Sequence, residues 1–190
     1  MRHEKNPLQS FTIGIAGGLI GTLAMDYYQQ SIAPQLFPQA ENQQASQNSS
    51  ADSISLIGRQ YRQDESSTDA LGRIAYTQVK GYEPDKVTKA TLSNTVHWSY
   101  GLLQGGLYGL ARAGVNDLDI PGGLAFGAGL YLLGDEMAVP MLGLQNGPTA
   151  FSAGEHLQGM ATHLVYGVAT AVATQCLHRL INKNALSFYP

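Results

Sequence analysis

The chain has 190 residues, a formal net charge of -3 and a single cysteine, Cys176. This charge leaves no basic surface for nucleic acid, and one cysteine excludes an internal disulfide and a multi-cysteine metal site. Only 13% of the residues are charged, compared with about 25% in ordinary soluble domains. The low charge favours a membrane protein, and the mean hydropathy of -0.11 averages apolar stretches with a polar insert around Gln39–Lys89.

Four segments combine few charges with enough apolar length to cross a bilayer as helices. They cover residues 8–32, 90–113, 120–144 and 154–181. Their uninterrupted apolar cores measure only about 15 to 19 residues, a length that a buried helix of a soluble protein also reaches. The first segment follows Arg2 and Lys5 and has features of a secretory signal. We expect it to remain uncleaved, because helical character continues through Gln30.

Small residues at four-residue intervals favour lipid as the solvent of these helices. Helices in a membrane associate through close backbone approach, which glycine permits, whereas a glycine in a soluble helix costs about 1 kcal/mol relative to alanine. The glycines expected to pack helix against helix are Gly14, Gly18, Gly101, Gly105, Gly109, Gly123, Gly127 and Gly167. We therefore predict an all-α fold, a bundle of four transmembrane helices forming one membrane domain. Its main partner is the lipid bilayer, and the glycine-lined faces are also compatible with self-association or with another membrane protein.

One long extramembrane loop, residues 33–89, separates the first two predicted spans. Its part over 39–51 is rich in glutamine, asparagine and serine and is expected to be an irregular linker. Apolar residues at positions 71, 74, 75 and 79 follow helical spacing, which predicts a short surface helix over 67–79.

Local signals mark the ends of the predicted helices. Pro84 and Asp85 suit a first helical turn that leads into the second span, and Asp119 suits an N-cap of the third. Ser152 and Glu155 form a capping-box pattern at the start of the fourth.

Four spans place both termini on the same side of the membrane, opposite the long loop. The terminal side carries basic residues, whereas the turn over 145–152 has none. Because cytoplasmic segments of membrane proteins are enriched in lysine and arginine, we expect both termini in the cytoplasm. The basic residues on that side are Arg2, Lys5, Arg112, Arg179 and Lys183.

Ionisable side chains within the spans form a predicted polar cluster. Each costs about 2.5 to 3.5 kcal/mol at a helix centre, so such side chains usually face the interior of a bundle. Successive spans run in opposite directions, and all of these ionisable side chains therefore fall toward the leaflet away from the termini. Tyr100 and Gln104 join the cluster because they share a helix face with His97. The members are Asp26, His97, Tyr100, Gln104, Asp135, Glu136, His156 and His163.

Three roles for the polar cluster stay open. Its members can hydrogen-bond between helices or lie at the headgroup boundary. They can relay protons or ions through Asp26, His97, Glu136 and His163, because histidine titrates near neutrality. They can bind a divalent metal or haem, with His97 and His163 as ligands beside Glu136 or Asp135. The sequence contains no closely spaced ligand motif and no catalytic motif, so it assigns neither a cofactor nor a catalytic residue.

Four short stretches carry a family resemblance. They are the glycine-rich run 17–26 ending in Asp26, the stretch 96–109 that contains His97-Trp98-Ser99-Tyr100-Gly101, the stretch 134–140, and 163–167. In these stretches the chain resembles the YagU-like family of small bacterial inner-membrane proteins. The resemblance covers the spans but not the insert 39–66. It implies a polytopic membrane protein of largely unassigned function, with a link to acid resistance for one member, and it implies no catalytic residue.

These patterns lead us to expect a non-enzymatic accessory or stress-related membrane protein organised around the polar cluster. The expected location is the bacterial inner (plasma) membrane, or a thylakoid membrane. The alternatives are a small proton- or ion-conducting membrane protein and a metal- or haem-binding one.

Overall fold

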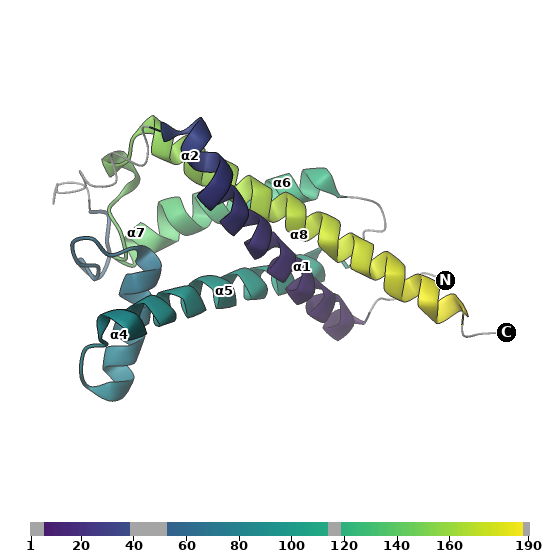
Figure 1. Cartoon of the computed structure of the whole chain (residues 1–190), viewed down its shortest axis with the longest axis horizontal. Coiled ribbons are helices and arrows are strands. Elements are labelled where there is room, and N and C mark those ends of the chain that lie inside the picture. The colour runs from purple at the N-terminus through teal and green to yellow at the C-terminus, as the bar shows by residue number, and fades with distance from the viewer. Residues whose placement is uncertain (1–5, 39–52, 114–118, 188–190) are drawn as a thin grey trace. The chain divides into compact units, whose positions relative to one another are not determined.

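The computed structural model describes residues 6–38, 53–113 and 119–187, and within these ranges all regular secondary structure is helical, as predicted (Figure 1). The chain divides into two compact units. Unit 1 comprises Met1–Ile32, Tyr100–Ala128 and Ala161–Pro190, and unit 2 comprises Ala33–Ser99 and Gly129–Met160. The predicted linker over 39–51 lies outside the described residues.

The first helical segment is longer than predicted. Helix α1, Pro7–Tyr27, continues through a π-helix, Tyr28–Ile32, into α2, Ala33–Leu36. The Asn6 side chain caps α1 by accepting a hydrogen bond of 3.0 Å from the backbone N–H of Leu8. The predicted end at residue 32 was therefore wrong by four residues, because the chain stays helical through this wider turn.

The predicted surface helix over 67–79 is present as α4, Ser67–Lys80. A capping box begins it, in which the Ser66 side chain accepts from the Asp69 N–H and the Asp69 carboxylate accepts from the Ser66 N–H. Gly81 ends the helix in the left-handed conformation, with φ of 77°. Ser66 and Gly81 therefore set where α4 begins and ends.

Helix α5, Lys86–Ala111, begins four residues before the predicted span and ends two residues before its predicted end. Asp85 precedes the helix, and its carboxylate accepts a hydrogen bond of 2.8 Å from the Thr88 N–H. The prediction that Pro84 and Asp85 lie in the first helical turn was therefore wrong. Asp85 stands just before the helix, as a capping residue does, and its side chain satisfies a free N–H of the first turn.

The third predicted span forms one helical run of three parts. These are α6, Ile120–Gly129, then a π-helix (η3), Leu130–Ala138, then α7, Val139–Met141. Asp119 caps α6 as predicted, by accepting from the Gly122 N–H at 3.1 Å. The run ends three residues before the predicted residue 144.

The last helix, α8, spans Ala153–Ser187, and a short 3-10 helix (η4), Pro148–Ala150, precedes it. The predicted capping box is confirmed, because the Ser152 N–H donates to Glu155 at 2.7 Å and the Glu155 N–H donates to the Ser152 hydroxyl at 3.3 Å. Helix α8 therefore starts one residue before the predicted 154, and it runs six residues past the predicted 181.

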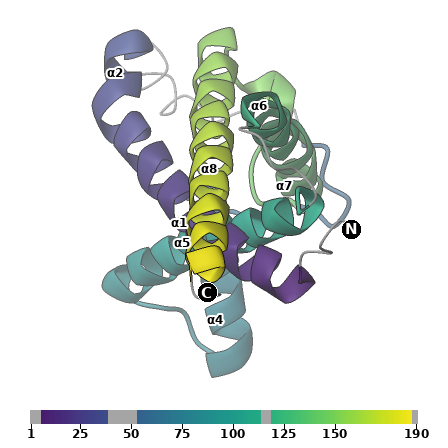
Figure 2. The same ribbon diagram turned by 90° about the vertical axis from the view of Figure 1, so that its right-hand side faces the viewer.

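Unit 1 is held together by backbone-level contacts at glycine. A Cβ built on Gly18 of α1 would lie 2.7 Å from the Gly101 carbonyl oxygen of α5, and one on Gly123 of α6 would lie 2.8 Å from the Gly167 carbonyl oxygen of α8. Figure 2 shows α6 running alongside α8. The remaining predicted packing glycines have equally close neighbours on a facing helix: Gly14, Gly105, Gly109 and Gly127.

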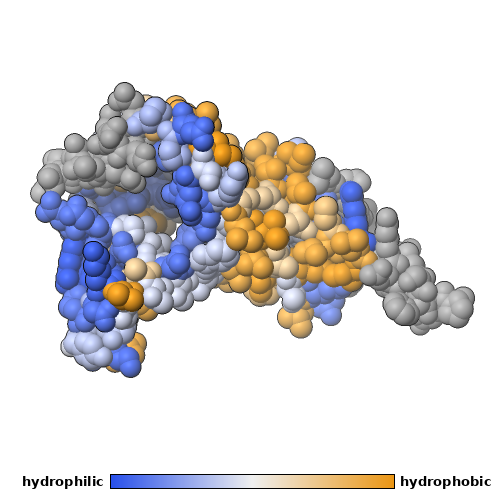
Figure 3. Space-filling view, viewed as in Figure 1, coloured by the Kyte–Doolittle hydropathy of each residue, from blue (hydrophilic) through white to orange (hydrophobic). Residues whose placement is uncertain are grey.

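The interior of unit 1 is small and polar, and its exposed faces are apolar. Apart from glycine, many of its buried side chains carry a hydroxyl or an amide, namely Ser10, Thr22, Thr162, Thr170, Thr174 and Gln175. Most of its exposed large hydrophobic side chains are aliphatic, and they include Leu19, Ile20, Leu23, Leu103, Leu107, Leu110, Leu124 and Leu180. Figure 3 shows hydrophobic side chains gathered over α1 and the unit 1 part of α8. This distribution is the reverse of that in a water-soluble domain.

Unit 2 orders much of the predicted polar loop. The Gln60 N–H donates to the Gly143 carbonyl at 2.8 Å, and the Leu56 N–H donates to the Met141 carbonyl at 2.9 Å. The hydroxyls of Thr68 on α4 and Ser93 on α5 lie 2.8 Å apart. The stretch 53–66 is therefore hydrogen-bonded to the chain at the end of α7, and α4 packs on α5.

Among the described helices, two are long and apolar enough to cross a membrane, Pro7–Leu36 and Ala153–Ile181. The helices over the other two predicted spans, 90–113 and 120–144, are not among them. The sequence expectation of an all-helical chain with membrane-length helices is thus met for two segments.

Candidate functional site

The members of the predicted polar cluster are distributed over both units. Asp26, Tyr100, Gln104 and His163 belong to unit 1, and His97, Asp135, Glu136 and His156 belong to unit 2. All are partly buried except Tyr100, which is exposed. Within unit 2 the structure brings Glu136 and His156 into direct contact.

Glu136 and His156 form a short contact between η3 and the first turns of α8. Oε1 of Glu136 lies 2.8 Å from Nδ1 of His156, and the two side chains are 17% and 32% exposed. At this distance the two side chains form a hydrogen bond that joins η3 to α8.

Tyr131 is the third member of this site, and the sequence analysis missed it. Its hydroxyl lies 3.0 Å from His156 Nδ1 and also hydrogen-bonds Glu136, and its side chain is buried. In an α-helix, residues five apart point about 140° away from each other around the axis. The π-helical i→i+5 pattern instead places Tyr131 and Glu136 about one turn apart on one face. No helical spacing rule applied to the sequence would have paired them.

The other ring nitrogen of His156 faces the turn before α8. Nε2 lies 3.0 Å from the Pro148 carbonyl oxygen, and the Phe151 ring packs edge-on against the imidazole at 6.1 Å between centroids. The Gln145 side chain donates to the Asp135 carbonyl at 2.6 Å. We call Tyr131, Glu136 and His156 the imidazole site. It joins η3 to α8, and its imidazole also contacts the Pro148 carbonyl of the turn over 145–152.

Metal binding at the polar cluster stays a prediction. The described part of the chain contains no group of three or more His, Cys, Asp or Glu side chains that could hold a metal ion. At the imidazole site the Nε2 atom is directed at a carbonyl, so the imidazole has no lone pair turned toward open space there. The ligand set His97, His163 and Glu136 draws on both units, and the geometry within unit 2 adds nothing in its favour.

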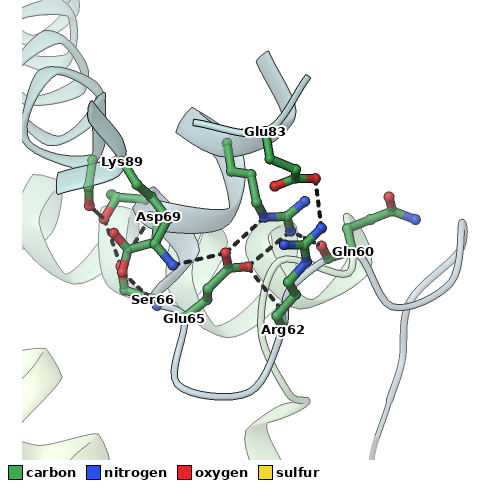
Figure 4. A network of polar contacts seen from close by, with 10 residues as sticks. Gln60, Arg62, Glu65, Ser66, Asp69, Glu83 and Lys89 are labelled. Atoms are coloured by element: carbon green, nitrogen blue, oxygen red, sulfur yellow. Dashed lines mark hydrogen bonds and ion pairs between the residues drawn. The ribbon is translucent and has the colours of Figure 1, made fainter. Parts of the chain in front are cut away.

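A second polar network surrounds Glu65 in the long loop (Figure 4). The Glu65 carboxylate accepts from Arg73 at 2.8 and 2.9 Å, from Lys89 at 3.1 Å and from the Arg62 N–H at 2.9 Å. Its side chain is only 2% exposed, and that of Arg73 is 9% exposed. Arg73 also donates to the Gln60 carbonyl at 2.7 Å. Three residues therefore donate to one carboxylate, Arg62 from the same loop stretch, Arg73 from α4 and Lys89 from α5.

This network sets the ionisation of Glu65. Burial by itself would raise the pKa of the carboxyl, but hydrogen bonds from Arg73, Arg62 and Lys89 outweigh that effect and lower the pKa to about 2. Hydrogen bonding to Glu65 in turn raises the pKa of Arg73. The pair stays charged at every physiological pH. No pattern in the sequence predicts this pair, because Glu65 lies before the helix that carries Arg73.

A third network closes the connection between α5 and α6 in unit 1. Asp119 accepts from Arg112 Nε at 2.5 Å and from the Tyr108 hydroxyl at 3.1 Å, in addition to capping α6. Burial would raise the pKa of Asp119, but the hydrogen bonds from Arg112, Gly122 and Tyr108 outweigh it and lower the pKa. These contacts hold the end of α5 to the start of α6, so we assign this network a structural role.

Comparison with known proteins found no relative of this chain, so the functional proposal starts from the sequence and the geometry. No protein-family model, no curated protein and no solved structure matches the chain.

Proposed function

We propose that this chain is an integral membrane protein, with the helical segments 7–36, 86–111, 120–141 and 153–181 crossing the bilayer as a four-helix bundle. The observation that supports the proposal best is the inverted distribution of unit 1, with hydroxyls and glycine inside and leucine and isoleucine outside. In water, soluble monomers rarely expose contiguous apolar patches above a few hundred Å². In lipid, the same faces need no partner.

The polar interior fits this solvent. Helices in a membrane gain little from burying leucine, because lipid tails are equally apolar, and they associate through small residues and interhelical hydrogen bonds. In unit 1 the Tyr166 hydroxyl of α8 donates to the Gly101 carbonyl of α5 at 2.6 Å, and both groups are buried. Such a bond is satisfied inside the bundle and leaves the outer face apolar.

Each of the two less apolar helices carries an ionisable group that is paired. In the run 120–141 the acidic Glu136 is matched by His156, and the charged end of α5 carries Lys89, which is matched by Glu65. A paired charge near a membrane costs much less than a free one. These segments can therefore cross the bilayer when they pack against α1 and α8.

The role we propose is that of a non-enzymatic accessory or stress-related factor of the bacterial inner membrane, related to the YagU-like family, with both termini in the cytoplasm. The supporting features are the family-like stretches, the absence of a catalytic motif from the sequence and the lack of basic residues in the turn over 145–152. A small proton- or ion-conducting protein is the second candidate, which the imidazole site favours.

Single-cysteine labelling separates four spans from two. In a Cys176→Ser background, an impermeant thiol reagent is applied to intact cells carrying either Ala113→Cys or Thr149→Cys. Four spans put these residues on opposite sides, so only Thr149→Cys is labelled before lysis. Two spans, 7–36 and 153–181, leave both on one side, and equal labelling would overturn the four-span proposal.

Solubility tests the membrane assignment itself. We expect the full chain to stay in the membrane fraction after alkaline carbonate washing and to require detergent for extraction. A chain that is monodisperse in plain buffer would overturn the assignment, whatever the labelling pattern.

A further inference from the structure

The stretch 54–57 of the long loop exposes apolar side chains. Leu56 is 74% exposed, Ile57 is 62% exposed, and Ile54 is exposed as well. A single exposed leucine is ordinary in any protein. Three exposed aliphatic side chains within four residues form a local apolar surface, and they contribute little to the packing of unit 2.

Hydrogen bonds hold this stretch at the end of α7. The Leu56 N–H donates to the Met141 carbonyl at 2.9 Å, and the Gln60 N–H donates to the Gly143 carbonyl at 2.8 Å. Leu142, which lies between the two acceptor residues, is also exposed. The position of the apolar stretch is therefore set by where α7 ends.

The apolar surface of the run 120–141 continues to the same point. Leu133 and Met137 are exposed on η3, and Leu142 follows at the end of α7. In the proposed four-helix bundle these side chains face lipid, and the end of α7 is where the run leaves the hydrocarbon. This step rests on the proposed function. It places Leu56 at the boundary between acyl chains and headgroups.

The turn formed by this stretch satisfies its own backbone groups. The Ile57 N–H donates to the Ser55 hydroxyl at 3.3 Å, and that hydroxyl donates to the Gly58 carbonyl at 2.8 Å. The Gln60 amide donates to the Ile57 carbonyl at 3.2 Å. Because a backbone group without a partner is costly away from water, this turn enters a water-poor layer at a lower cost than an open loop does.

The charges next to the stretch fit a phospholipid surface. Residues 53–61 include no aspartate or glutamate, and their one charged residue is Arg59, which lies 4.3 Å from the centroid of the Tyr61 ring. Tyrosine is enriched at the level of the headgroups. Arginine reaches the same level with its charged end while its stem covers apolar surface, and it attracts anionic lipid.

We propose that the stretch 54–57 is an interfacial anchor, which inserts Leu56 and Ile57 into the lipid leaflet in which α7 ends. Interfacial elements bury their apolar side chains about 5 to 10 Å into the boundary between headgroups and acyl chains. The Gln60 carbonyl, at the end of this turn, accepts from Arg73 of α4 at 2.7 Å. The anchor therefore also holds α4 close to the membrane surface.

Single tryptophans in the full chain report insertion. Trp98 is the only tryptophan, and Trp98→Phe gives a background without indole. The Leu56→Trp variant in this background is reconstituted into vesicles of phosphatidylcholine and phosphatidylglycerol. The phosphatidylcholine carries bromine either near the glycerol end or near the far end of its acyl chains. We expect loss of fluorescence mainly with the shallow bromine, and protection from acrylamide in the water.

Val79→Trp is the matched control. Val79 belongs to the same unit and is 80% exposed, but it lies at the end of α4, beside a connection that carries several charges. These are Lys80, Glu83, Asp85 and Lys86. We expect acrylamide to quench this tryptophan and both brominated lipids to leave it unchanged. Equal lipid quenching at residues 56 and 79 overturns the proposal, because adsorption of the whole unit would then explain it.

Leu133→Trp separates this inference from the proposed function. Leu133 is exposed on η3, within the segment proposed to cross the bilayer. Lipid quenching at residue 133 without quenching at residue 56 overturns the anchor and leaves the four-span proposal standing. That result would also leave the apolar stretch to a protein partner. Quenching at neither position overturns both proposals.

A charge in the anchor tests whether its apolar side chains cause insertion. Ile57→Trp is the reporter, and Leu56→Asp is added to it. We expect the charge to reduce quenching by the shallow bromine, because a carboxylate is costly at the acyl boundary. Val79→Asp in the same reporter should leave the quenching unchanged. Equal quenching with and without Leu56→Asp overturns the proposal, and circular dichroism checks that each variant keeps its helix content.

Discussion

The backbone of Gly18 on α1 lies directly against the backbone of α5 at Gly101, so that a Cβ at residue 18 would stand 2.7 Å from the Gly101 carbonyl oxygen and 2.9 Å from the Gly105 Cα. These neighbours are main-chain atoms and cannot rotate away. The two helices therefore meet main chain against main chain, and this close approach depends on the missing side chain.

Gly18→Ala is expected to destabilise the protein by about 1 to 3 kcal/mol, the usual cost of overpacking a tight interface. Gly129→Ala is the matched control. It lies in the same kind of helical backbone, but a Cβ there would find nothing within 4 Å. The control should gain up to about 1 kcal/mol from helix propensity. Thermal unfolding of both variants in one detergent gives the comparison, and equal midpoints would contradict the packing model.

Glu65→Gln is expected to cost about 3 kcal/mol, because it leaves the Arg73 guanidinium, 9% exposed, without its counter-charge. Glu83→Gln removes the partner of Arg62 in an exposed pair, whose side chains are 57% and 48% exposed, and should cost less than about 1 kcal/mol. Chemical unfolding at pH 7 measures both. A similar loss in the two variants would show that burial adds nothing to the Glu65 network.

The Glu65 network also predicts a loss of stability in acid. The pKa of Glu65 is lowered from its ordinary 4.5 to about 2 in the folded chain. Its contribution is therefore complete above pH 4.5 and disappears as the pH falls toward 2, a change of about 3 kcal/mol. Unfolding at pH 3 and pH 6 should differ more in the parent than in Glu65→Gln. The same slope in both would assign acid sensitivity to other groups.

Gly143 and Gly81 test two different reasons for a glycine. Both have positive φ, 68° and 77°, which alanine adopts at a cost of about 1 to 2 kcal/mol. A Cβ on Gly143 would also lie 2.7 Å from the Ser55 hydroxyl and even closer to the Gly58 carbonyl, whereas one on Gly81 meets nothing within 4 Å. Gly143→Ala should therefore cost about 1 to 3 kcal/mol more than Gly81→Ala. The free energies of unfolding of the two variants test this. Equal costs would mean that the stretch 53–66 moves away from the new methyl group without loss of stability.

The helices and several of their ends were predictable from local signals. Asp119 and the pair Ser152 and Glu155 satisfy N–H groups within their own first turn, so their role follows from positions a few residues apart. The surface helix over 67–79 followed from its apolar spacing in the same way. Local chemistry determines such features, and no knowledge of the rest of the fold is needed.

The imidazole site was predictable only in part. Glu136 and His156 stood out because ionisable groups are expensive in an apolar helix, but nothing in the sequence indicated that they pair, or that Tyr131 joins them. The Glu65 network was invisible for a related reason. Its contacts join residues 8 and 24 positions apart through a folded loop, and such tertiary contacts leave no periodic pattern.

The π-helix over Leu130–Ala138 has a consequence for recognising related chains. Its wider turn carries one residue more than an α-helix needs to bring Tyr131 and Glu136 to the same face. A homologue with a one-residue deletion here would form an ordinary α-helix and keep the tyrosine and the acid adjacent, at a separation of about one α-helical turn. An alignment that forbids a gap inside this segment would not align Glu136 with the acid of such a homologue, and it would hide the shared site.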